Sequence, residues 1–203
     1  MTNTSTIFVA SAGTGKTTTL MGLLTDCLEK TSPGKICFTT FTKAGATEAI
    51  DRALVKNDTY AQSDFEAFST LHALCYRRIP RKQMLTVQDY KQIGELTGYP
   101  ISGSAAYSSK DGLVYNSNAG DKILYYDSLM RNLKISAEEV INSQIGARVT
   151  ADQLTEFSKF YKDYKLKKGK YDFTDQLEKY LDQNIQPEFD YVFVDEAQDL
   201  SPL

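Results

Sequence analysis

The chain has 203 residues, 41% hydrophobic and 24% charged, a balance typical of a soluble globular protein. Its 23 basic and 26 acidic side chains give a net charge of −3, so a nucleic-acid partner would need a local basic patch. Three cysteines without a C-x-x-C pair and a single histidine exclude a zinc site rich in these ligands. The short polar N-terminus is no signal peptide and no apolar run reaches about 18 residues, so we expect a cytoplasmic protein without a membrane segment.

The first part of the chain predicts strands alternating with helices. An apolar run over residues 7–10 is typical of a buried strand, and the stretch 15–28 repeats apolar residues at helical spacing. The β-branched and aromatic residues of 36–41 predict a second strand. Helices are predicted over 43–55 and over 71–79, the second one stopped by the following proline.

The middle section, residues 81–168, predicts helices and no clear strand. Residues 101–120 are rich in Ser, Gly, Asn and Tyr and predict a long loop. The predicted helices cover 86–96, 121–133 and the stretch from 150 to about 168, with capping-box pairs at Ser136/Glu139 and Thr150/Gln153.

The last part predicts a helix over 172–181 and a buried apolar strand over 191–194. Strands near both ends with helices between them favour a parallel sheet with crossover helices. We therefore predict an α/β fold with one domain built from 1–80 and 169–203, and a mostly helical insertion over 81–168.

A glycine-rich turn follows the first predicted strand. Its sequence, ASAGTGKT from Ala10 to Thr17, matches the Walker A pattern except that Ala10 replaces the first glycine. Glycines allow positive φ and turn N–H groups toward a phosphate, and the helix that follows points its positive end at the anion. A glycine turn before a capped helix is the alternative, which the flanking elements disfavour. The predicted nucleotide-binding residues are Ala12, Gly13, Thr14, Gly15, Lys16, Thr17 and Thr18.

Within this turn Lys16 can reach the β- and γ-phosphates, and the Thr17 hydroxyl can bind Mg²⁺. The strand over 191–194 ends in Asp195 and Glu196. In P-loop enzymes this is where Mg²⁺ and the attacking water are handled, so we expect Asp195 to hold the ion through water and Glu196 to orient and deprotonate the attacking water. A solvated acidic turn is the alternative, but the lysine and the carboxylates each predict the other.

The segment from Asp195 to Asp199, DEAQD, resembles helicase motif II of the UvrD/Rep branch of superfamily 1, DE-x-QD. Residues 40–48, 69–75 and 171–177 resemble, in the same order, motif Ia, motif Ib and the DFDDLL segment of that family. The sequence departs from the family at four residues and lacks one further family residue. Lys43 and Ala44 stand where Asn and Lys are usual, Leu71 replaces Phe, Thr18 stands where an arginine is frequent, and no counterpart of the adenine-reading glutamine precedes Ile7.

The resemblance implies a RecA-like P-loop motor domain with an inserted helical subdomain. It implies that Lys16, Thr17, Asp195 and Glu196 carry ATP hydrolysis and that Gln198 senses the γ-phosphate. It also places Phe41, Thr42, Lys43, Thr70 and His72 along the path of single-stranded DNA, where an aromatic face can stack on any base and hydroxyls and lysine can hold phosphates. Core packing for Phe41 and a structural role for His72 are the alternatives.

Helicases of this family use a second RecA-like domain that supplies arginine fingers. We therefore expect the sequence to end before that domain. We also expect it to be a monomer that binds ATP, Mg²⁺ and single-stranded DNA or a single-strand/duplex junction. Hydrolysis should be negligible, because an arginine finger contributes about 10³ to 10⁵ in rate. Two other readings stay open: a different P-loop ATPase or small-molecule kinase, and a non-catalytic module that binds DNA or a helicase partner.

A run of lysines lies between Lys162 and Lys170. It has two interpretations: a stripe facing DNA, or a solvated helix face, which is the more frequent use of such a pattern.

Overall fold

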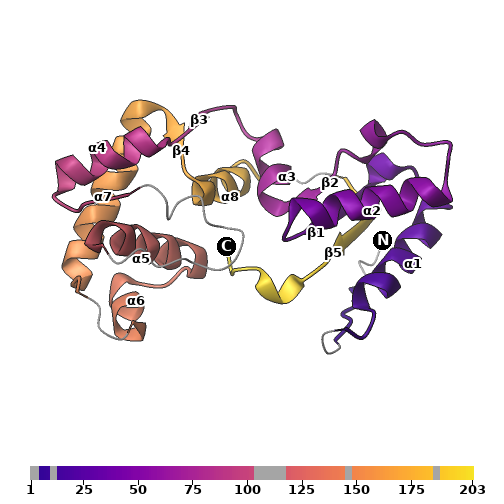
Figure 1. The fold of residues 1–203 in the computed structure, drawn as a ribbon, viewed down its shortest axis with the longest axis horizontal. Coiled ribbons are helices and arrows are strands. Elements are labelled where there is room, and N and C mark those ends of the chain that lie inside the picture. Colours follow the sequence, from indigo (N-terminus) through magenta and orange to yellow (C-terminus); the bar gives the residue numbers. More distant parts are fainter. Residues whose placement is uncertain (1–4, 10–12, 103–117, 145–147, 185–187) are drawn as a thin grey trace. The chain divides into compact units, whose positions relative to one another are not determined.

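The computed structural model describes residues 5–9, 13–102, 118–144, 148–184 and 188–203 (Figure 1). The chain divides into two units, one made of Met1–Leu74 with Gln186–Asp199 and the other of Cys75–Ile185 with Leu200–Leu203. The division differs from the boundaries expected from sequence, because residues 75–80 and 169–184 belong to the second unit. The assignment of the expected boundaries to a motor domain and an insertion stays a prediction.

The first unit contains a parallel sheet of three strands in the order β2-β1-β5. The strands are β1 (Ile36–Thr40), β2 (Phe68–Thr70) and β5 (Tyr191–Val194). All five residues of β1 are buried, as expected of a central parallel strand. The predicted α/β fold with a parallel sheet is therefore confirmed.

Two helices of the first unit cover this sheet, α1 (Lys16–Leu28) and α2 (Lys43–Lys56). Both were predicted to within two residues at each end, and both bury one apolar face. The sheet contributes Phe38, whose ring stacks on Phe68 and Phe193 at centroid distances of 5.6 and 6.2 Å. The short 3-10 helices η1 (Pro33–Lys35), η2 (Gln62–Phe65) and η4 (Ala197–Asp199) complete the unit, together with the start of α3 (Leu71–Arg78).

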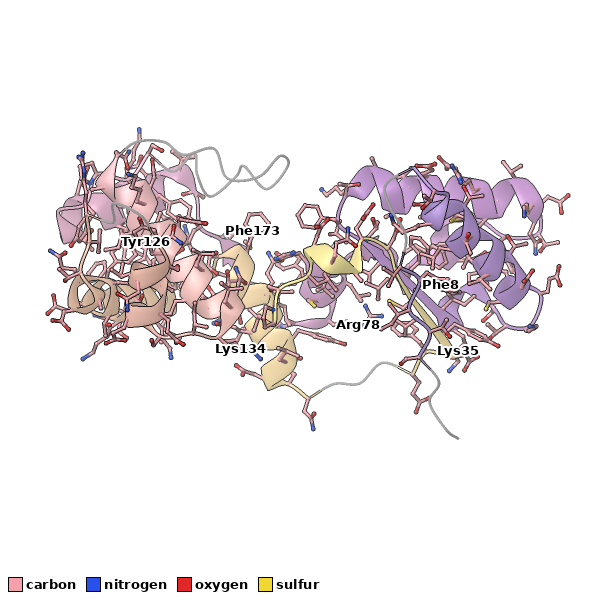
Figure 2. The ribbon with its side chains drawn as sticks, turned by 90° about the horizontal axis from the view of Figure 1, so that it is seen from below. Phe8, Lys35, Arg78, Tyr126, Lys134 and Phe173 are labelled. Carbon is pink, nitrogen blue, oxygen red and sulfur yellow. The ribbon has the colours of Figure 1, made fainter. Side chains whose placement is uncertain are left out.

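The strand predicted over residues 7–10 is not formed in its described part. Residues 5–9 are not in a strand; Ile7 is 84% and Val9 91% exposed, and the Phe8 side chain also reaches solvent (Figure 2). Ala10 lies outside the described residues. An apolar run becomes a strand only where a neighbouring strand pairs with its backbone groups, and no described strand does so here.

The last strand forms where it was predicted but is not fully buried. β5 pairs with β1 and, among the described strands, with no other. Val192 is 61% exposed, whereas Phe193 is buried. The prediction of a buried strand was therefore wrong for part of β5, because apolar composition does not distinguish a central strand from an edge strand.

The second unit is mainly helical. Its helices are α4 (Val87–Thr97), α5 (Ala119–Leu133), α6 (Ala137–Ser143), α7 (Ala151–Lys168) and α8 (Phe173–Asp182). Both predicted capping boxes are present, at the starts of α6 and α7. The most buried side chains of this core are Ile93, Ile123, Val140 and Leu154.

A short parallel pair, β3 (Gln83–Met84) and β4 (Lys170–Tyr171), joins two segments of the second unit that lie far apart in sequence. The sequence did not reveal this pair, because two-residue strands carry no periodicity. Most of the predicted loop 101–120 lies outside the described residues, but Ala119 and Gly120 already belong to α5. Within the described ranges, no helix has the length and apolar character needed to cross a membrane.

Candidate functional site

The described part of the glycine-rich turn before α1, from Gly13 onward, has the positive φ values that its glycines predict. Gly13 and Gly15 have φ of 75° and 83°, in the left-handed region that side-chain-bearing residues rarely adopt. Space does not require these glycines, because a Cβ on either would meet no atom within 4 Å. It is therefore the positive φ of the backbone that requires glycine at these two positions. Ala12 lies outside the described residues, so its expected role is not addressed by the structure.

The N-terminus of α1 carries positive potential with little side-chain compensation. Gly15 is its N-cap, no side chain caps it, and no acidic residue occupies the first turn. Lys16 and Thr17 are half-buried in that turn, while Thr14 and Thr18 are exposed. A helix end of this kind favours an anion.

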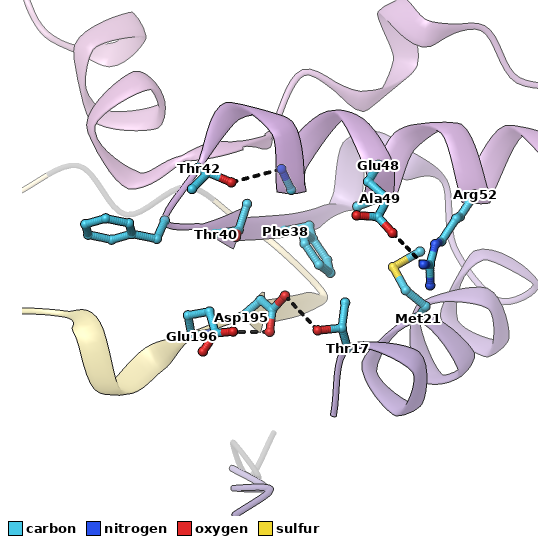
Figure 3. Close-up of a pocket in the computed structure, with 12 residues that line it drawn as sticks. Thr17, Met21, Phe38, Thr40, Thr42, Glu48, Ala49, Arg52, Asp195 and Glu196 are labelled. Atoms are coloured by element: carbon cyan, nitrogen blue, oxygen red, sulfur yellow. Dashed lines mark hydrogen bonds and ion pairs between the residues drawn. The ribbon is translucent and has the colours of Figure 1, made fainter. Parts of the chain in front are cut away.

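The end of β5 lies beside this helix start. The Thr17 hydroxyl donates a hydrogen bond to Asp195 Oδ2 at 3.4 Å (Figure 3). Asp195 extends the pairing of β5, since its N–H donates to the Thr39 carbonyl oxygen at 2.9 Å. Two of the residues predicted from separate motifs are thus brought together.

The next residue, Glu196, has an unusual backbone. Its φ is 54°, a conformation that costs a non-glycine residue about 1 kcal/mol or more. Its N–H donates to Asp195 Oδ1 at 3.1 Å, and its carboxylate accepts a hydrogen bond from Gln198 Nε2. The turn therefore connects three of the predicted catalytic and metal-binding side chains.

The donor set around Thr17 and Asp195 fits Mg²⁺. Both side chains offer oxygen, the ligand type that a hard divalent cation prefers. Adjacent ligands of an octahedral Mg²⁺, each at about 2.1 Å, lie about 3 Å apart, close to the 3.4 Å that separates the two oxygens.

A pocket of about 240 Å³ opens beside these groups (Figure 3). Its walls come from α1, from the end of β1 and the turn after it, from α2 and from the residues after β5. The lining residues are Thr17, Met21, Phe38, Thr40, Phe41, Thr42, Gly45, Glu48, Ala49, Arg52, Asp195 and Glu196.

Two of the lining residues that were not predicted as site residues are charged, Glu48 and Arg52 of α2. They form an ion pair at 2.5 Å, four residues apart on the helix. The spacing of opposite charges indicates such a pair, but it does not tell which face of α2 borders a pocket.

The residues expected along a DNA path divide into two groups. Phe41 and Thr42 line the pocket, with Lys43 exposed directly after them. Phe41 is 52% exposed, so the alternative that it belongs to the core is wrong. The Thr42 hydroxyl oxygen caps α2 by accepting from the Gly45 N–H at 3.0 Å.

Thr70 and His72 do not line this pocket. The Thr70 hydroxyl oxygen accepts a hydrogen bond from the Ala73 N–H at 3.3 Å, at the start of α3. His72 is half-buried, and burial lowers its pKa, which favours the neutral imidazole. Both residues therefore sit at a helix start, where a structural role and a DNA contact are both compatible with their position.

The lysine run is not one uniform surface. Lys165 is buried between two aspartates of α8, and Lys170 pairs with Asp89 at 2.6 Å. Lys162, Lys167 and Lys168 are exposed. Neither a continuous DNA-facing stripe nor a fully solvated face describes the run, because two of its members are used inside the second unit.

Comparison with known proteins agrees with this arrangement. A family model described as the UvrD/REP helicase N-terminal domain matches residues 1–203, and a search of curated proteins found no match. The match covers all the motifs on which the resemblance rested. It also covers the parallel sheet, in which β1 leads into the motif Ia-like segment and the paired β5 leads into the motif II-like segment. The chain therefore belongs to the UvrD/REP helicase N-terminal domain family.

Proposed function

We propose that this chain is the ATP- and DNA-binding N-terminal part of an ATP-dependent DNA helicase. The single observation that carries the proposal is the contact between Thr17 and Asp195. It joins the start of the helix after a P-loop-like turn to the acidic end of a neighbouring strand, which is the arrangement that P-loop enzymes use for nucleotide and metal.

In this proposal Lys16 and the N-terminal turn of α1 hold the phosphates of ATP. The Thr17 hydroxyl and Asp195 hold Mg²⁺, which supplies charge neutralisation at the phosphate oxygens when bound. Glu196 orients the attacking water and accepts its proton. Gln198 positions Glu196 through their hydrogen bond.

Full turnover needs a further positive charge at the transferred phosphate. The arginine among the described lining residues, Arg52, is paired with Glu48. We propose that this charge comes from a second RecA-like domain of the parent protein. On its own, this chain should accordingly bind ATP and hydrolyse it very slowly.

The turn between β1 and α2 is the proposed start of the single-strand path. Phe41 presents an exposed ring, and Lys43 adds a charge at the first residue of α2. An aromatic platform beside a cation suits binding without sequence preference.

Titration with Mg²⁺–ATP tests the nucleotide site. Lys16→Ala should weaken binding by about tenfold or more, since a charge-assisted contact contributes about 1.5–3 kcal/mol. Lys30→Ala, an exposed lysine beyond the other end of α1, is the matched control. Equal ATP affinities for the chain and for both variants would contradict a nucleotide site at Lys16.

Activity and binding assays on the same protein distinguish the two alternative functions, a small-molecule kinase and a non-catalytic binding module. Transfer of phosphate to a small molecule would indicate a kinase, and DNA binding without any nucleotide binding would indicate a non-catalytic module. Robust DNA-stimulated ATP hydrolysis by the chain alone would contradict the need for a second domain.

A further inference from the structure

A cluster of charged side chains lies inside the second unit, away from the residues of the proposed nucleotide site. Two cations, Arg131 of α5 and Lys165 of α7, face four carboxylates. Most of these side chains are strongly buried: 14% of the Arg131 and 6% of the Lys165 side chain is exposed. The carboxylates belong to Asp127 of α5, to Asp172 and Asp175 at the start of α8, and to Glu178 in the middle of α8.

Both cations contact the same two aspartates. Arg131 donates to Asp172 Oδ2 at 2.7 Å and to Asp175 Oδ1 at 2.6 Å. Lys165 Nζ donates to the same two oxygens, at 2.6 and 2.8 Å. The cluster thus joins three helices from different parts of the chain, α5, α7 and α8 (Figure 1).

The other oxygen of each aspartate is used within α8. Asp172 is the N-cap, and its Oδ1 accepts from the Asp175 N–H at 2.8 Å. Asp175 Oδ2 accepts from the Asp172 N–H, also at 2.8 Å. The capping box that starts α8 therefore consists of the same two carboxylates that bind the cations.

The charges in the cluster depend on each other. Burial alone would raise the pKa of Asp172, but Lys165 and Arg131 outweigh it and hold that pKa well below its usual value. Burial raises the pKa of Asp127 against the effect of Arg131. Removal of one cation would leave these buried carboxylates with a single positive partner, and this loss of compensation destabilises their charged form.

We propose that Asp172 and Asp175 form an electrostatic clasp that keeps α8 folded and docked on α5 and α7 only while Arg131 and Lys165 are both present. The reason is the shared use of the two carboxylates. Losing a cation weakens the docking contact and the helix cap together, so α8 opens locally before the rest of the unit unfolds. The segment that resembles the family's DFDDLL sequence thus stabilises α8 in this chain. This structural role does not depend on the proposed ATP site.

Hydrogen exchange of the full chain, followed by mass spectrometry, tests this clasp. Arg131→Gln and Lys165→Gln should each raise exchange rates across α8 by about tenfold or more, while the rates of α4 and α6 stay within about twofold of the parent. Arg131→Lys, which keeps the charge but loses the planar guanidinium, should give a smaller increase. Lys167→Gln, at an exposed lysine of α7, is the matched control and should leave α8 unchanged.

Unchanged exchange in α8 would overturn the proposal, and so would an equal rise in α4, α6 and α8, which would indicate only a general loss of stability. If Arg131→Gln does not fold, Glu178→Gln gives a milder test, because it weakens the hold on Arg131 and keeps both cations. Glu178 is partly exposed and contacts Arg131, and it has no part in the capping box of α8. This variant should speed exchange modestly in α8 alone, and no local effect in either Glu178→Gln or Lys165→Gln would contradict the clasp.

Discussion

The Thr17 hydroxyl and the Asp195 carboxylate lie 3.4 Å apart although 178 positions separate them in the sequence. The contact exists because α1 starts beside the carboxyl end of β5. It brings two side-chain oxygens to one point beside a helix N-terminus, an arrangement that suits the proposed Mg²⁺ bound to phosphate.

Replacing Thr17 by alanine should weaken the Mg²⁺-dependent part of nucleotide binding by about tenfold, because one oxygen ligand is lost. ATP titrations in Mg²⁺ and in EDTA measure this part as the difference between the two affinities. Thr47→Ala removes a similar hydroxyl from an exposed position on α2, where it bonds only to the Lys43 carbonyl oxygen among the described contacts. The prediction fails if both variants retain the full effect of Mg²⁺.

Phe41→Ala should raise the Kd for a labelled oligothymidine by about tenfold, since stacking contributes about 1–3 kcal/mol per base. The dependence of Kd on salt should not change, because the ring carries no charge. Fluorescence anisotropy at several salt concentrations measures both quantities. Phe173→Ala removes another exposed ring, at the first residue of α8 (Figure 2), and an equal loss there would argue against a specific role for Phe41.

Asp89, at the start of α4, contributes stability that depends on pH. Its Oδ2 accepts hydrogen bonds from Lys170 Nζ at 2.6 Å and from the N–H of Thr86 at 2.8 Å. Burial opposes the charged form, but these contacts outweigh it and lower the pKa from 3.8 to about 2. Because the folded-state pKa lies below the unfolded value, the stabilisation is complete above about pH 4. It is lost as the pH falls toward 2.

Asp89→Asn should therefore lower the free energy of unfolding by about 2 kcal/mol at pH 7, with a difference from the parent that shrinks between pH 4 and pH 2. Urea unfolding at a series of pH values measures the difference. Asp163→Asn, at an exposed position of α7, should show a small difference with little dependence on pH. A constant gap for Asp89→Asn down to pH 2 would contradict the assigned contacts.

Two glycines in helices should respond in opposite directions to alanine. A Cβ on Gly120, in the first turn of α5, would lie 2.1 Å from the Pro100 carbonyl oxygen, so Gly120→Ala should destabilise the chain by about 1–3 kcal/mol. Gly22 lies inside α1 with nothing within 4 Å of such a Cβ. Gly22→Ala should stabilise it by about 0.5–1 kcal/mol. Urea unfolding of both variants measures the two signs, and a gain for Gly120→Ala would show that the segment at Pro100 can move aside.

Local patterns predicted the helices well. The capping boxes at Ser136 and Thr150 and the left-handed Gly169, with φ of 63°, mark helix ends in the structure as they do in the sequence. These signals need only a few neighbouring residues, because a cap satisfies backbone groups within one turn. The strand expected over residues 7–10 failed for the opposite reason, since a strand depends on a partner that lies elsewhere in the chain.

By itself, the sequence determined the helix boundaries, the conformation of the glycine-rich turn, the parallel α/β class and the order of the family motifs, because each depends on short-range geometry or on residue identity. Only the tertiary structure decided that Thr17 meets Asp195, that Phe41 is exposed, and that Lys165 is buried beside Asp172 rather than part of a basic surface. These are contacts between segments far apart in the chain or matters of burial, and both depend on how the elements pack.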